Sequence, residues 1–259
     1  MFVSTISPVA FTLGPISVRW YGLLFSGGFI LGYFIMQYLY RRKNYDAADL
    51  DRLLLYLFIG TIIGARLGHC LIYEPDYYLS HPLEILKIWH GGLASHGGTL
   101  GVLVALWLYK ARSPLPLLEV TDMLSIPVAL VCTFIRVGNF CNSEILGLPT
   151  NTDYGVIFAT LGETLPRHPA MLYEAAAYFL IFLVSGLIYF KWRNCPRGFL
   201  TGLFFVTCFG SRFLIEPFKE EQADYSTGIA LDVGQLLSIP CILLGVVLLI
   251  YSLKGAGRN

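Results

Sequence analysis

The sequence predicts an all-α polytopic membrane protein with seven transmembrane helices, an external N-terminus, a cytoplasmic C-terminus and a small extracytoplasmic (periplasmic) cap. Its composition is the first reason: 56% of the 259 residues are hydrophobic and only 14% are charged, whereas about 25% are charged in a soluble domain. The second is a series of long apolar stretches, and the third is the side on which the basic residues gather. A chain this apolar has too few polar side chains to cover a surface in water.

Seven stretches are long enough to cross a hydrocarbon core of about 30 Å, which takes about 20 helical residues. We expect the helices at roughly 18–40, 50–73, 92–109, 118–140, 169–190, 198–218 and 232–253. The third stretch is the shortest, and it begins with the glycine-rich string GGLASHGG. With no internal repeat in the chain, the simplest organisation is a single transmembrane bundle domain spanning residues 1–259.

The basic residues between these stretches set the predicted orientation. The connections after the first, third, fifth and seventh stretches carry Arg41, Arg42, Lys43, Lys110, Arg112, Lys191, Arg193, Arg197, Lys254 and Arg258. The other side carries Arg19, Lys87, Arg167 and Lys219 together with many acids. Since cytoplasmic loops are enriched in Lys and Arg, the first side is expected to be cytoplasmic. The longer connections 74–91, 141–168 and 219–231 then form the extracytoplasmic cap.

Charge and cysteine content exclude several classes of function. The net charge of +1 provides no overall field for nucleic acid, so no nucleic-acid partner is expected. The six cysteines are scattered without a CxxC pair, which favours neither a disulfide framework nor a zinc site. The first residues also lack the basic region of a cleavable signal peptide.

Four arginines lie inside the predicted spans. Arg52 is near a cytoplasmic end, from which its side chain can reach the membrane surface, whereas Arg66, Arg136 and Arg212 need another explanation. An arginine near the bilayer centre costs at least about 2.5–3.5 kcal/mol, and such residues usually face a cavity or a partner. Arg212 and Glu216 have the i, i+4 spacing that places two side chains on one helical face. The alternatives are therefore buried structural ion pairs, such as Arg212–Glu216 and Arg66 with some acid, or one polar cavity lined by all three arginines.

The residue types favour a lipid-processing enzyme. Arginine has a permanent charge and a planar fork that binds phosphate through two hydrogen bonds, and histidine is the side chain best suited to move a proton near neutral pH. A transporter or lipid-binding protein with a polar cavity is the competing class, although matching half-helices in two halves of the chain are not found. A purely structural scaffold leaves the buried arginines unexplained.

The string IRVGNFCNSEILG at residues 135–147 closely resembles the signature of the prolipoprotein diacylglyceryl transferases, which are seven-span bacterial membrane enzymes. Further strings follow in the family's order: RWYG at 19–22, GARLGH at 64–69, WHGGLASHGG at 89–98, RHPAMLYE at 167–174 and RFLIEPFK at 212–219. The sequence departs from the family pattern at Cys208-Phe209, where a tyrosine is common before the glycine, and at Lys219, where an arginine is usual.

The resemblance implies transfer of the diacylglyceryl group from phosphatidylglycerol to the lipobox cysteine of a prolipoprotein signal peptide. The products would be a thioether-linked lipid and glycerol-1-phosphate, with no metal or organic cofactor. It also implies a multi-pass protein of the bacterial cytoplasmic (inner) membrane, with its active site toward the periplasmic leaflet. The partners would be the membrane lipid and the prolipoprotein.

The resemblance also implies roles for individual residues. His96 matches the family's candidate base for the acceptor thiol, and Arg136 and Arg212 match its essential arginines, which we assign to the phosphate of phosphatidylglycerol. Four further positions would contact or organise the lipid head group. They are Tyr21, as a hydrogen-bond donor, and Asn139, Asn142 and Glu144, which would orient the glycerol.

Glu216 completes this expected site by holding Arg212 in place. Simpler roles remain open for several of these residues. His96 could be a packing residue beside Gly97 and Gly98, because glycines mark close helix contacts in membranes. Tyr21 could belong to the aromatic belt at the membrane surface. Asn142 and Glu144 could cap the helix end instead of contacting lipid.

Overall fold

The computed structural model describes residues 2–220 and 231–256, and the chain divides into two compact units. The first unit joins Met1–Met36 with Leu118–Asn259, and the second is Gln37–Leu117. Helix α1 (Trp20–Arg42) begins in the first unit, and its last turns belong to the second. The predicted site residues are thereby divided, because His96 lies in the second unit and the others lie in the first.

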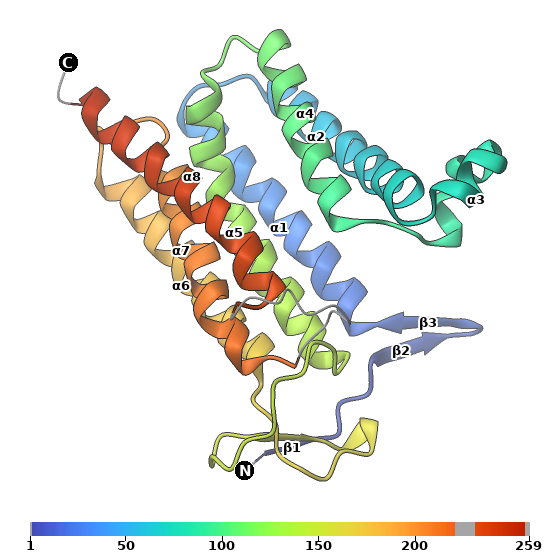
Figure 1. Ribbon diagram of the computed structural model, residues 1–259. Coiled ribbons are helices and arrows are strands. Elements are labelled where there is room, and N and C mark those ends of the chain that lie inside the picture. The colour runs from blue at the N-terminus through green and yellow to red at the C-terminus, as the bar shows by residue number, and fades with distance from the viewer. Residues whose placement is uncertain (1, 221–230, 257–259) are drawn as a thin grey trace. The chain divides into compact units, whose positions relative to one another are not determined.

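Helices α5 (Leu117–Cys141), α6 (Ala170–Lys191), α7 (Phe199–Ile215) and α8 (Val233–Ala256) form the body of the first unit (Figure 1). Helix α1 packs on α5 where Gly28 approaches the Phe134 ring. Helices α7 and α8 approach closely at Gly202 and Gly245, since a Cβ on either glycine would lie 2.9 Å from the carbonyl oxygen of the other. Close backbone approach at small residues is the usual way that helices pack in a membrane.

A buried cluster of Ala129, Tyr178, Ile181 and Cys208 joins α5, α6 and α7. Cys208, one of the positions that depart from the family pattern, is therefore a small apolar packing residue, and Phe209 packs against the same cluster. This cluster ties together the three helices that carry Arg136, Glu174 and Arg212.

The second unit is built on α2 (Ala47–Gly68) and α4 (Ser95–Arg112). A π-helical turn (His69–Tyr73), α3 (Pro75–Ser80) and two 3-10 turns (Pro82–Leu86 and Ile88–His90) connect them. The two long helices meet along Gly60, Gly64 and Gly68 of α2 and Gly97 and Gly101 of α4, where the nearest atom of the other helix would lie 1.9 to 2.7 Å from an added Cβ. The close contact expected beside His96 is confirmed.

Six helices in the described part of the chain are long and apolar enough to span a membrane. They are Trp20–Arg42, Ala47–Tyr73, Leu117–Cys141, Ala170–Lys191, Phe199–Phe218 and Val233–Gly255. The third predicted stretch, 92–109, is also helical, but α4 begins only at Ser95. Its polar first turn, and Lys110 and Arg112 in its last turn, leave it less apolar than the other six. The described part is thus a mainly helical polytopic membrane protein.

Short strands accompany the helices. Strand β1 (Phe2–Ser4) pairs in parallel with β4 (Val156–Phe158), and β2 (Val9–Leu13) forms a hairpin with β3 (Ile16–Arg19). The β1–β4 pair fixes the start of the chain to the connection between α5 and α6, which also contains a 3-10 turn at Ala159–Leu161. Of the predicted connection 219–231, residues 221–230 lie outside the described residues.

Candidate active site

Arg136 lies one turn before the end of α5 and points at Glu174 in the first turns of α6. Its Nε is 2.8 Å from Glu174 Oε2, and the Glu174 side chain is completely buried. Nη1 also donates a hydrogen bond of 3.4 Å to Asn139 Oδ1, one turn further along α5. Because the carboxylate has lost all contact with water, it depends on neighbouring cations for compensation.

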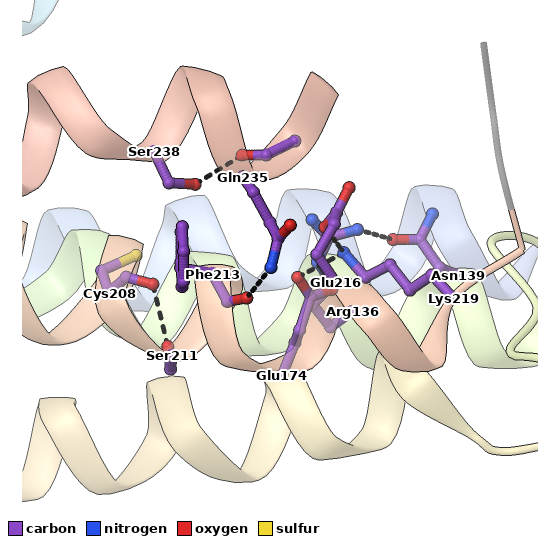
Figure 2. A network of polar contacts seen from close by, with 11 residues as sticks. Arg136, Asn139, Glu174, Cys208, Ser211, Phe213, Glu216, Lys219, Gln235 and Ser238 are labelled. Atoms are coloured by element: carbon purple, nitrogen blue, oxygen red, sulfur yellow. Dashed lines mark hydrogen bonds and ion pairs between the residues drawn. The ribbon is translucent and has the colours of Figure 1, made fainter. Parts of the chain in front are cut away.

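Lys219 is the second cation on Glu174, as Figure 2 shows. Its Nζ donates hydrogen bonds of 2.8 Å to Glu174 Oε1 and to Glu216 Oε2. Glu216 begins a 3-10 turn (Glu216–Phe218) that extends α7, so a single lysine joins the end of α7 to α6. Arg136, Lys219, Glu174 and Glu216 form the ion network, in which two positive and two negative charges balance.

The signature segment folds back on the end of α5. Glu144 accepts hydrogen bonds of 3.0 Å from Asn139 Nδ2 and 3.1 Å from Asn142 Nδ2. The turn requires positive φ angles at Ser143 (55°) and Ile145 (58°). A β-branched residue rarely adopts this conformation, so the surrounding contacts must hold it there. Four predicted site residues, Arg136, Asn139, Asn142 and Glu144, thus lie in one connected group.

The predicted pairing of Arg212 with Glu216 is wrong. Glu216 binds Lys219 instead, and its carboxylate lies so close to α8 that a Cβ on Gly234 would be 1.8 Å from Oε1. Arg212 is half-buried and makes no ion pair with any residue that the structure describes. The i, i+4 backbone relation holds, because the Glu216 N–H donates to the Arg212 carbonyl oxygen. The Glu216 carboxylate nevertheless binds Lys219, three residues further along the chain.

Tyr21 lies at the start of α1 and packs against α5, where a Cβ on Gly138 would be 2.9 Å from its ring. The ring is therefore next to the helical turn that carries Arg136 and Asn139. Gln235 of α8 donates a hydrogen bond of 3.2 Å to the Phe213 carbonyl oxygen (Figure 2). This bond fixes the start of α8 to the residue that follows Arg212 in α7.

His96 belongs to the second unit, where it is the second residue of α4. Its side chain is exposed and makes no hydrogen bond with a described residue. Arg66 lies in the same unit, and the alternative of a buried ion pair with an acid does not hold for it. Its guanidinium binds backbone carbonyl oxygens instead. Arg66 is therefore not available to share a phosphate with Arg136 and Arg212.

One charged residue outside the spans stabilises the connection between α5 and α6. Arg167 donates a hydrogen bond to Glu163 (2.9 Å), and this bond raises the pKa of Arg167. The same guanidinium donates to the Gly147 carbonyl oxygen, so it joins the end of the signature segment to the strand region before α6. In the part of the chain that the structure describes, no group of three His, Cys, Asp or Glu side chains could hold a metal ion.

Comparison with known proteins decides the family. The family model of the prolipoprotein diacylglyceryl transferases matches residues 8–251. The chain belongs to this family. The matched residues contain all the motifs quoted above, from RWYG to RFLIEPFK.

Curated relatives of this chain are named phosphatidylglycerol–prolipoprotein diacylglyceryl transferase. One from Tolumonas auensis is 52% identical over 97% of this chain and 97% of its own length. One from Chloroherpeton thalassium is 48% identical over 96% and 94%, and one from Bacteroides fragilis is 42% identical over 93% and 91%. The similarity therefore covers nearly the full length of each protein.

The expected site does not include Glu174 and Lys219, although these residues form the centre of the ion network. The available signal was an acid inside an apolar stretch, which needs a cation as a partner. No spacing rule connects Glu174 with Lys219, because 45 residues separate them. Only the packing of α6 beside the end of α7 reveals the pair.

Proposed function

We propose that this chain transfers the diacylglyceryl group of phosphatidylglycerol to the lipobox cysteine thiol of a prolipoprotein, the first step of lipoprotein maturation. Membership of the family, over residues 8–251, carries this proposal. In the step, the cysteine sulfur forms a bond to the glyceryl carbon while the bond from that carbon to the phosphate oxygen breaks. Glycerol-1-phosphate leaves with the bonding electrons, and the thiol proton passes to a base and then to solvent. The step balances without a metal or a redox cofactor.

Arg212 and Arg136 are proposed to hold the phosphate. The leaving group gains one negative charge as the carbon–oxygen bond breaks, so fixed cations at that oxygen stabilise the transition state more than the ground state. Arg212 fits this role because its charge is not neutralised by any described residue. The charge of Arg136 is neutralised by Glu174. Arg136 therefore contributes through its remaining N–H groups, which can donate hydrogen bonds to the phosphate.

The signature amides are proposed to hold the glycerol head group. Asn142 Oδ1 is buried and accepts no hydrogen bond from the described residues, and a buried acceptor without a donor is costly. A glycerol hydroxyl would supply that donor. Asn139 and Glu144 keep Asn142 in place through the hydrogen bonds described above. Tyr21, packed on Gly138, is placed to donate from its hydroxyl to the same head group.

His96 is proposed as the base for the acceptor thiol. Thiolate, not thiol, is the nucleophile, and an imidazole is best matched to remove the proton near neutral pH. Its exposed position at the start of α4 suits a group that must meet a second, protein substrate.

For the whole molecule we propose seven transmembrane helices, with α4 as the seventh, in one bundle domain in the bacterial inner membrane. The N-terminus lies outside, the C-terminus lies in the cytoplasm, and the active site faces the periplasmic leaflet. The ten basic residues on one side support this orientation. At about 1.5 Å per residue, the 18 residues of α4 nearly match the hydrocarbon core.

The test is mass spectrometry of a lipobox peptide after incubation with the purified protein and phosphatidylglycerol. We expect the peptide to gain the mass of one diacylglyceryl group on cysteine, and no gain with the matched Cys→Ser peptide. His96→Gln should slow the transfer, and higher pH should partly restore it because more of the peptide is then thiolate. A protein that binds the lipid but leaves the cysteine unmodified would instead be a lipid-binding protein or transporter.

A further inference from the structure

Arg66 makes an unusual set of contacts in the second unit. The residue is only 3% exposed, and all five N–H donors of its guanidinium point at main-chain carbonyl oxygens. The acceptors are Ile85 for Nε (2.9 Å), Gly91 and Gly92 for Nη1 (2.5 and 3.2 Å), and Glu84 and Lys87 for Nη2 (2.6 and 3.2 Å). One face of the guanidinium lies 5.0 Å from the centre of the Tyr78 ring. No N–H remains for a substrate.

These carbonyl groups come from two parts of the chain between α3 and α4. Glu84 and Ile85 belong to the 3-10 turn Pro82–Leu86, with Lys87 next to it. Gly91 and Gly92 form the turn that leads to α4, and both have positive φ angles (85° and 70°). Lysine has three donors on one nitrogen and cannot reach both parts in this way, whereas the planar fork of arginine can.

The segment fixed by Arg66 leads directly to His96. Only three residues separate Gly92 from His96, and one of them, Ala94, donates a backbone hydrogen bond to the Ala65 carbonyl oxygen (2.9 Å). Immediately after His96, Gly97 is packed against the backbone of Gly64 and Gly68. The main chain on both sides of His96 is thus fixed to α2.

The imidazole of His96 has no such support of its own. It is exposed and makes no hydrogen bond with a described residue, so its place depends on the backbone that carries it. We infer that Arg66 is a positioning residue for the transfer reaction: it fixes the turn before α4 so that His96 meets the acceptor thiol in a productive geometry. This inference rests on the proposed function and on the proposed role of His96.

A double-mutant cycle on Arg66 and His96 tests this inference, with the peptide assay as its readout. Arg66→Lys keeps the charge but removes two of the five donors, and it should lower kcat about 10- to 100-fold, since a displacement of about 1 Å can cost 10²-fold. The KM for phosphatidylglycerol should change less than about threefold. The double variant Arg66→Lys/His96→Gln should be about as slow as His96→Gln alone, because Arg66 acts only through His96.

A second variant changes the turn itself and keeps Arg66, in case Arg66→Lys does not fold. Gly91→Ala meets no atom within 4 Å, so its only cost is the strained φ angle at one of the two carbonyl ligands of Nη1. It should show the same loss of kcat and the same absence of additivity with His96→Gln. Gly162→Ala is the matched control: its φ is 74°, its surroundings are open, and its kcat should be that of the wild type.

The outcomes separate the two proposals. In one outcome, the wild type transfers the lipid while the losses of kcat multiply in the double variants. That result would show that Arg66 acts through general stability, and it would overturn this inference alone. Unchanged kcat in Arg66→Lys would do the same. If the wild type leaves the peptide unmodified, the proposed function fails, and the positioning role fails with it.

Discussion

The two units compensate a buried arginine in different ways. In the second unit, Arg66 is surrounded by five backbone carbonyl oxygens and contacts no acid among the described residues. In the first unit, Arg136 faces the completely buried carboxylate of Glu174, which it shares with Lys219. One arginine organises the main chain, whereas the other belongs to a network of side chains.

This difference separates arginines that support the fold from arginines that can hold a substrate. Arg66 has used all of its donors, Arg136 contacts described residues through Nε and Nη1 only, and Arg212 pairs with no described acid. If burial alone were the criterion, Arg66 would be ranked first and Arg212 last as a phosphate-binding residue. Available N–H groups and uncompensated charge are the better guide to phosphate binding.

The largest expected effect distinguishes Arg212 from Arg136. Both Arg212→Ala and Arg136→Ala should lower transfer about 10³-fold, as expected when a preorganised donor to a developing anion is lost. Only Arg136→Ala should also lower the free energy of unfolding, by about 1–3 kcal/mol, because it removes a partner of buried Glu174. Peptide mass spectrometry and thermal unfolding in detergent measure the two quantities.

Equal stability losses in these two variants would contradict the distinction, since Arg212 would then have a structural partner. Wild-type transfer in both variants would remove both arginines from the mechanism. Arg212→Lys and Arg136→Lys separate the effect of charge from that of geometry, because lysine retains the charge but lacks the planar fork of arginine.

The next effect concerns the centre of the ion network. Glu174→Gln leaves Arg136 without its acid and Lys219 with only one, so it should destabilise the protein by about 3 kcal/mol. Glu216→Gln should cost less, about 1 kcal/mol, because Glu216 binds one cation and is 16% exposed. Thermal unfolding of the two variants in the same detergent gives the comparison. A larger loss for Glu216→Gln would place the centre of the network elsewhere.

A further stability effect tests the backbone contacts of the second unit. Gly101→Ala would place a Cβ 1.9 Å from the Gly60 carbonyl oxygen, and such overpacking should destabilise the α2–α4 pair by about 2 kcal/mol. Gly186→Ala in α6 meets no atom within 4 Å and should be neutral or slightly stabilising. Unfolding temperatures should therefore fall only for Gly101→Ala, and a similar fall in both would show that the glycine contacts are loose.

Much of the fold could be predicted from the sequence, because long apolar stretches have few alternatives in a membrane. Six predicted spans are helices of sufficient length and hydrophobicity. The helix at 92–109 was harder to place. Its glycines allow close contact with α2, but they add little to the hydrophobicity of the stretch. The short strands were missed because pairs such as Phe2–Ser4 with Val156–Phe158 depend on residues more than 150 positions apart.

The site was less predictable than the fold. The resemblance to the family signature grouped Arg136 with Asn139, and a hydrogen bond joins the two side chains. The i, i+4 spacing of Arg212 and Glu216 did not produce a pair, because the Glu216 carboxylate binds Lys219 instead. The partners of Arg66 could not be predicted, since carbonyl oxygens occur at every residue and only the folded main chain selects five of them.

The most direct test of the phosphate role is the equilibrium dissociation constant for short-chain phosphatidylglycerol. Arg52→Ala is the charge-matched control, because Arg52 is 43% exposed and binds the Arg112 carbonyl oxygen in the second unit. Arg212→Ala should raise the Kd about tenfold or more, which corresponds to the loss of a charge-assisted hydrogen bond, and Arg52→Ala should leave the Kd unchanged. An Arg212→Ala protein that binds the lipid as tightly as the wild type would contradict the assignment of this arginine to the phosphate.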